Sequence, residues 1–179
     1  FFHHVKVPKA NVLGDPTKGF YYLMAGLAEE RLISTVESLA SAQKAFDITL
    51  AFTKDRKLFN KSLSDFQNTQ FKLADLRAEL DMQQIYLDQC VKALGQNALT
   101  AVDAAKAKLL ASELLCRVVD EGVQLHGGAG YMDEYPISRM YTDARVTRIY
   151  AGTSEVMKLI IGRDLYQDEA VEFIDRDLP

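Results

Sequence analysis

The chain has 179 residues, about the length of one ordinary domain. Hydrophobic residues make up 48% of it, and only 10 glycines and 4 prolines are present, which argues against disordered and fibrous classes. The net charge is −4, and acidic and basic residues are interspersed, so we expect neither a nucleic-acid surface nor a polybasic membrane anchor. No apolar run approaches the roughly 18 residues that a membrane span requires.

The first 18 residues have a different pattern from the rest of the chain. Phe2, Val5 and Val7 suggest the alternation of a β-strand, and the prolines and glycines that follow indicate a loop. A lone strand has no partner within the chain. We therefore expect residues 1–18 to be the last strand of a β-domain and a linker, and residues 19–179 to be a separate C-terminal domain.

Beyond this segment, the hydrophobic spacing is that of helices. Three long amphipathic helices are predicted over about residues 20–54, 65–95 and 100–126, with two shorter ones over 137–143 and from residue 153 onward. The acidic residues at the end of the chain are expected to fray. Long helices joined by short loops predict an all-α fold, an antiparallel four-helix bundle.

The side chains that carry sulfur or imidazole do not form a set of metal ligands. Cys90 and Cys116 fall within the helical patterns, where we expect reduced thiols that pack as small core side chains. His3, His4 and His126 make no ligand set either, and no zinc-binding motif is present. The sequence therefore predicts no metal site.

Two glycine-containing stretches carry the most information about function. They are QLHGGAGY at residues 124–131 and DARVTRIYAGTSE at residues 143–155. Each joins a glycine turn to polar side chains at a helix end, where free backbone N–H groups can bind a ligand. Together with VKVP at residues 5–8 and RKLF at residues 56–59, followed by Gln67, they stand in the order of the motifs of the flavin-dependent acyl-CoA dehydrogenases. Over nearly its whole length, the chain resembles the C-terminal portion of that family.

The resemblance implies that FAD is bound across a subunit interface. Arg56 would pair with the pyrophosphate, for which a guanidinium is suited, although an arginine here could also be a solvated helix end. The Gly127-Gly128 pair would let the backbone approach the adenine end of FAD closely. The alternative is that the pair is a helix C-cap, and one pair of glycines could serve both purposes. Asn60 stands where many relatives have glycine, and asparagine tolerates a positive φ. The implied FAD contacts are Arg56, Phe59, Gln67, Gln124, Gly127, Gly128, Thr153 and Glu155.

The expected catalytic base is absent from its usual place. Many relatives carry a glutamate directly after the tyrosine of the last motif, where this chain has Ala151. A minority of the family places the glutamate on the first long helix, directly before an arginine, and Glu30-Arg31 has that register. Glu30 is therefore the predicted base, and the backbone N–H of Ala151 would still donate to the thioester carbonyl. Tyr150 would border the substrate.

The helical spacing gives separate support for this base. Leu27 belongs to an apolar stripe that begins at Phe20, and Glu30 is the next member of the stripe, as expected for a carboxylate that extends into a pocket. Glu29 points about 100° away on the helix and is the poorer candidate. Arg31 would help to close the pocket over the substrate. The open alternative is a solvated acidic turn, in which Glu29 or Glu30 pairs with a lysine or arginine.

The resemblance implies oxidation of an acyl-CoA to the trans-2-enoyl-CoA, by abstraction of the α-proton and transfer of the β-hydride to FAD. It also implies an electron-transfer flavoprotein as partner, a homodimer or homotetramer, and a bacterial cytoplasmic or mitochondrial matrix location. We expect the chain to be inactive alone. Two alternatives are kept: a related flavin oxidase or monooxygenase on the same scaffold, and a non-catalytic helical assembly module. The sequence does not set the acyl chain length.

Overall fold

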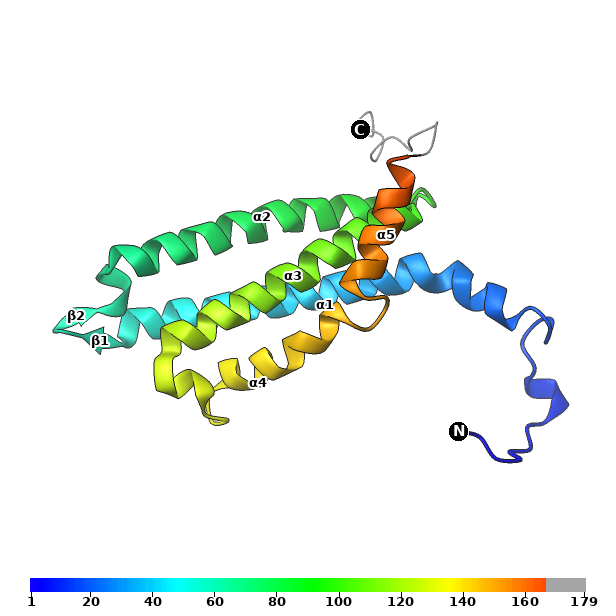
Figure 1. Ribbon diagram of the computed structural model, residues 1–179, viewed down its shortest axis with the longest axis horizontal. Coiled ribbons are helices and arrows are strands. Elements are labelled where there is room, and N and C mark those ends of the chain that lie inside the picture. Colours follow the sequence, from blue (N-terminus) through cyan, green and yellow to red (C-terminus); the bar gives the residue numbers. More distant parts are fainter. Residues whose placement is uncertain (167–179) are drawn as a thin grey trace.

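Residues 1–166 are described by the computed structural model, and within them the fold is all-α, as predicted (Figure 1). The acidic end of the chain, expected to fray, falls outside these residues. Three long helices lie along one another, and α4 lies beside α1 and α3, while α5 packs across α3. The helices are α1 (Gly19–Asp55), α2 (Gln67–Gly95), α3 (Ala101–His126), α4 (Pro136–Ala144) and α5 (Ser154–Asp164).

Local hydrogen bonds set the ends of these helices. Thr100 caps α3, because its hydroxyl accepts from the Asp103 N–H at 3.0 Å, and Thr153 caps α5 in the same way. Asp65 was the expected start of the second helix, but it lies in a 3-10 turn, Leu63–Asp65, where it forms a capping box with Ser62. The helix α2 therefore begins two residues later than predicted.

The first 18 residues differ from the expectation. They contain one 3-10 turn, Lys9–Asn11, and no strand forms in residues 1–18, which find no neighbouring strand to pair with in the described part of the chain. The segment is held to the start of α1 by Tyr22, whose hydroxyl accepts a hydrogen bond from the Asp15 N–H at 3.0 Å. The first long helix, α1, starts directly after this segment, at Gly19.

A small hairpin that the sequence did not predict joins α1 to α2. Its strands, β1 (Lys57–Leu58) and β2 (Lys61–Ser62), pair antiparallel around the two residues Phe59 and Asn60. Both of these have a positive φ, of 50° and 63°, as a two-residue type I′ turn requires. The turn thus forms with asparagine at its second position, a residue that tolerates a positive φ.

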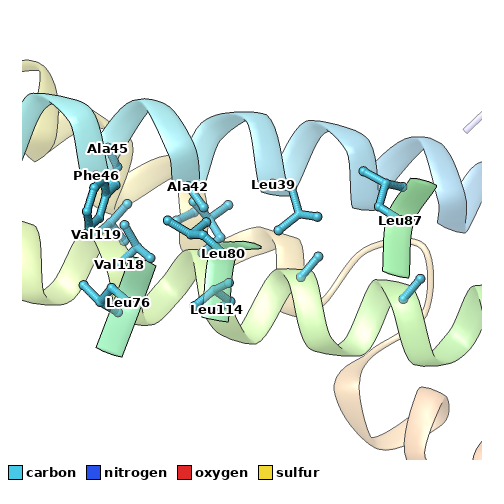
Figure 2. Close-up of a cluster of buried hydrophobic side chains, with 14 of the residues drawn as sticks. Leu39, Ala42, Ala45, Phe46, Leu76, Leu80, Leu87, Leu114, Val118 and Val119 are labelled. Carbon is cyan, nitrogen blue, oxygen red and sulfur yellow. The ribbon is translucent and has the colours of Figure 1, made fainter. Parts of the chain in front are cut away.

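The core runs along the seam between the three long helices (Figure 2). Cys90 is fully buried within it, and burial raises the pKa of its thiol to about 11; Cys116 is partly buried, and both thiols are free. The predicted packing of Cys90 as a small core side chain is therefore confirmed. The seam is formed by Leu39, Ala42, Phe46, Leu76, Leu80, Leu87, Leu114, Val118 and Val119.

One glycine sets how closely α3 approaches α1 and α4. A Cβ on Gly122 would lie 2.7 Å from Ile137 Cδ1 and 2.8 Å from Thr49 Oγ1. Any larger residue would force these helices apart. In residues 1–166, no helix combines the length and the apolar character that crossing a bilayer requires.

Candidate active site

The predicted site residues fall into two groups at opposite ends of α3. One group combines residues of the turn at 149–153 with residues of α1, and we call it the turn cluster: Leu27, Glu30, Arg31, Tyr150, Ala151, Thr153 and Glu155. The other lies around the hairpin and the end of α3, and we call it the hairpin cluster: Arg56, Phe59, Gln67, Gln124, Gly127 and Gly128. Lys108, which contacts the turn, and His126, at the end of α3, are about 27 Å apart at the rise of an α-helix.

The turn at residues 149–153 has a strained backbone. Ala151 has a φ of 53°, in the left-handed region that costs a non-glycine residue on the order of 1 kcal/mol. Gly152 follows with a φ of 97°, and a Cβ there would stand 2.5 Å from Met157 Cε, so only glycine fits. Within residues 1–166, the Ala151 N–H has no hydrogen-bond acceptor. The turn therefore presents a backbone donor that has no acceptor in the described structure.

Two charged residues of α3 hold this turn in place. Lys108 Nζ donates to the Gly152 carbonyl oxygen at 2.7 Å. Glu113 Oε1 accepts from Arg148 Nε at 2.9 Å, just before the turn, and from Ser154 Oγ at 2.8 Å, just after it. The strained backbone is thus fixed at three points by one helix.

The sequence analysis did not single out Lys108 or Glu113. The available signal was a lysine at helical spacing with small apolar residues: Ala104, Ala105 and Ala111 share its buried face. The Lys108 side chain is only 1% exposed. Burial lowers its pKa, Glu113 and Glu155 raise it, and Arg31 lowers it further. Arg31 of α1 is therefore close enough to act on the same group.

Arg31 is buried, with 7% of its surface exposed. Burial lowers the pKa of its guanidinium, and the neighbouring Glu30 carboxylate partly offsets that effect. Its Nε is shielded from solvent without a hydrogen-bond partner among the described residues. No ion pair joins Glu30 and Arg31 among residues 1–166, so the structure does not show the surface pair of the alternative interpretation.

Glu30 itself is exposed in this chain. Its Oε1 lies 4.0 Å from the place that a Cβ on Gly26 would take, so the carboxylate folds back along α1 toward the N-terminal end of the helix. Leu27 is half-buried one turn earlier. The carboxylate of the predicted base is thus exposed on α1, next in sequence to the buried Arg31.

A stripe of buried polar atoms continues along α1 from Arg31. The hydroxyls of Ser34 and Ser38 are also buried without a hydrogen-bond partner in the described part of the chain. Ser38 lines a cavity of about 340 Å³, whose wall also includes Tyr150 and Thr147. Buried polar groups normally have partners, so three unpaired ones in a row point to a ligand or a protein surface that completes them.

The hairpin cluster presents exposed polar and aromatic groups. Arg56, at the end of α1, and Gln67, at the start of α2, are both exposed. Phe59 is 83% exposed and holds a left-handed backbone, a conformation in which a bulky aromatic residue is strained. An exposed aromatic on a strained turn beside a free guanidinium is suited to packing against a cofactor that carries phosphates.

The end of α3 supplies the rest of this cluster. Gly127 is the C-cap, with a φ of 59°, and its N–H bonds to the Gln124 carbonyl, so the helix-cap reading holds. Gln124 and Gly128 are exposed, and a Cβ on Gly128 would meet no atom within 4 Å. The backbone there is open to a ligand, so its function as a helix cap is compatible with the predicted contact to the adenine end of FAD.

Comparison with known proteins identifies the family that shares this fold. The chain matches the acyl-CoA dehydrogenase C-terminal domain over residues 17–166. It is 41% identical to the mitochondrial long-chain specific acyl-CoA dehydrogenase of Sus scrofa over 169 residues. The matched region covers 94% of this chain and 39% of that relative. An acyl-CoA dehydrogenase structure from Geobacillus kaustophilus matches with a TM-score of 0.89 and 41% identity, over 93% of this chain and 44% of that one.

A further structure bears on the cofactor. The acyl-CoA dehydrogenase of Bacillus anthracis, solved in complex with FAD, matches with a TM-score of 0.81 and 32% identity, over 89% of this chain and 31% of that one. The chain belongs to the acyl-CoA dehydrogenase family and corresponds to its C-terminal domain. It spans about two-fifths of the length of the long-chain enzyme that it matches.

Proposed function

We propose that this chain supplies the catalytic base and parts of the FAD and acyl-CoA sites of an acyl-CoA dehydrogenase, which converts an acyl-CoA to the trans-2-enoyl-CoA. The observation that carries the proposal is the strained turn at Ala151, whose N–H lacks an acceptor in residues 1–166. A free, fixed donor suits a thioester carbonyl that gains negative charge during the reaction. Family membership supports the substrate class.

In the proposed mechanism, Glu30 removes the α-proton of the acyl group and the Ala151 N–H donates to the thioester oxygen. The negative charge that develops on this oxygen strengthens that hydrogen bond in the transition state. Arg31 and Tyr150 border the substrate, and Leu27 contributes apolar surface next to the base. Thr153 and Glu155 would hold the flavin end of FAD, which would supply the acceptor for the hydride of the β-carbon.

The separation of the two clusters bears on how FAD would be held. In one chain they lie about 27 Å apart along α3, and α4 packs on α3 between them, with Cys116 Sγ donating to the Ala144 carbonyl. One FAD molecule would therefore not contact the turn cluster and the hairpin cluster of the same chain. We propose that Thr153 and Glu155 meet the flavin end of one FAD, while the hairpin cluster binds the pyrophosphate and adenine end of another. Such an arrangement requires at least a homodimer.

The remaining assignments follow from the family. We propose that the electrons pass to an electron-transfer flavoprotein, that residues 1–18 end a β-domain, and that residues 19–179 form the helical domain. The bacterial cytoplasm and the mitochondrial matrix both remain compatible with the relatives, since the relative from Sus scrofa is named as mitochondrial.

The proposal is tested by replacing Glu30 in the intact protein. Glu30→Gln removes the base and retains the shape of the side chain, so kcat should fall by about 10²-fold to 10⁴-fold while FAD content stays the same. Glu29→Gln is the matched control, one residue away on a different face of α1, and should retain activity. Wild-type turnover by Glu30→Gln would remove this residue as the base.

The same protein distinguishes the alternative flavin chemistries. With an added dye as electron acceptor and without oxygen, a dehydrogenase should convert acyl-CoA to enoyl-CoA over many turnovers. Turnover that continues only in air would instead indicate an oxidase or a monooxygenase. Absence of any flavin reduction by acyl-CoA would favour the assembly module.

A further inference from the structure

Lys108 is the largest of the fully buried side chains among residues 1–166. Taking an ammonium group out of water is unfavourable unless specific contacts offset the loss of hydration. The contact that the structure provides is the hydrogen bond of 2.7 Å from Nζ to the Gly152 carbonyl, which joins residues 44 positions apart. A buried charge is thus directed at one backbone carbonyl of the strained turn.

This carbonyl lies just beyond the donor used in the proposed mechanism. On the other side of Ala151, the Tyr150 N–H bonds to the Val146 carbonyl at 3.2 Å. Ala151 therefore stands between two fixed points, one from the preceding 3-10 turn and one from Lys108. Without the second, the left-handed backbone at Ala151 and Gly152 could relax and turn the Ala151 N–H away.

An ion pair with Glu113 does not explain the position of the buried Lys108 ammonium group. Glu113 Oε1 already accepts hydrogen bonds from Arg148 and Ser154. Glu113 acts on Lys108 through its charge, without a hydrogen bond between the two side chains in the described structure. The specific partner of Lys108 is the turn.

We propose that Lys108 is a positioning residue: it fixes the Gly152 carbonyl and so holds the Ala151 N–H in the orientation that receives the substrate thioester. The role of the N–H rests on the proposed function, whereas the fixation of the turn does not depend on it. The two parts can therefore be tested separately.

The first test measures amide hydrogen exchange in the full chain. Lys108→Met removes the donor and keeps an unbranched side chain of similar length. Leu114→Ala is the control, because Leu114 is fully buried on the same helix and belongs to the apolar core. In Lys108→Met, the amides of Tyr150 and Val156 should exchange at least about 10-fold faster, while that of Val118 is unchanged. In Leu114→Ala, the core amides should be the ones that accelerate.

The second test measures steady-state kinetics in the intact, FAD-loaded protein. Lys108→Met should lower kcat about 10-fold or more, with KM and FAD content near those of the wild type, because a misplaced donor weakens transition-state binding. Lys108→Arg, which restores a donor, should recover part of kcat. Leu114→Ala should change stability and leave kcat near the wild-type value.

Four outcomes would count against these inferences. Wild-type exchange at Tyr150 and Val156 in Lys108→Met, or the same exchange pattern in Lys108→Met and Leu114→Ala, would overturn the fixation of the turn. Faster exchange with an unchanged kcat would overturn the positioning role. A wild-type protein with no dehydrogenase activity would overturn the proposed function instead, and the exchange rates would still decide whether Lys108 fixes the turn.

Discussion

The imidazole of His126 stacks on the ring of Phe52, with centroids 4.0 Å apart and planes 24° from parallel. This contact joins the C-terminal ends of α1 and α3, and it brings Arg56 and the exposed glycines of residues 127–128 to the same end of the bundle (Figure 1). His126 Nδ1 also lies 2.7 Å from the Gly122 carbonyl oxygen. A buried ring thus organises the hairpin cluster without itself being exposed to a ligand.

The burial of His126 predicts a pH dependence of stability. Burial lowers the pKa of its imidazole below 6.5, and the hydrogen bond with Gly122 only partly offsets this. The unfolded chain then takes up the proton first as the pH falls. The stabilisation is present above about pH 6.5 and is lost as the pH drops toward the folded-state pKa. Urea unfolding between pH 8 and pH 5 should show this loss.

The control for that measurement is His126→Gln, which has no imidazole to titrate. Its stability should decline less than that of the wild type over the same pH range. Identical slopes for the two proteins would mean that other groups cause the dependence.

Gly122→Ala should destabilise the domain. The added methyl group would lie within 3 Å of both Ile137 Cδ1 and Thr49 Oγ1, and overpacking of this kind costs about 1 to 3 kcal/mol. Gly162→Ala in α5 is the matched control, since a Cβ there meets no atom within 4 Å. That substitution should be neutral or stabilise by up to about 1 kcal/mol. Thermal or urea unfolding of both variants checks the prediction.

Phe59→Asn should separate stability from cofactor binding. Asparagine tolerates the left-handed backbone of this hairpin turn better than phenylalanine, so the free energy of unfolding should rise by about 1 kcal/mol or less. The exposed ring, however, would be lost as a packing surface for FAD. The intact variant should therefore retain less FAD on gel filtration. Unchanged FAD content would exclude a cofactor contact by Phe59.

The chain alone should bind FAD weakly or not at all. Its two clusters lie at opposite ends of α3, so each FAD would meet only half of the contacts that one chain can offer. Flavin fluorescence titration of the 179-residue chain checks this. Tight binding of one FAD per chain would contradict this prediction.

The sequence by itself determined the features that depend on neighbouring residues. Helical spacing and caps such as Thr100 and Thr153 act over three or four positions, so the helices and most of their ends could be predicted. The ordered motifs identified the family because each is a short continuous stretch. Asn60 was expected to adopt the positive φ that its turn requires, because this tolerance is a property of the residue itself.

Only the tertiary structure decided which distant groups meet. The strand expected in residues 1–18 does not form, because pairing needs a neighbour that local pattern cannot supply. Nothing near Lys108 in the sequence indicates that it bonds to Gly152, or that Arg31 is buried beside it. Hydrogen bonds between residues far apart along the chain depend on how whole helices pack, and that packing arises from many weak contacts acting together.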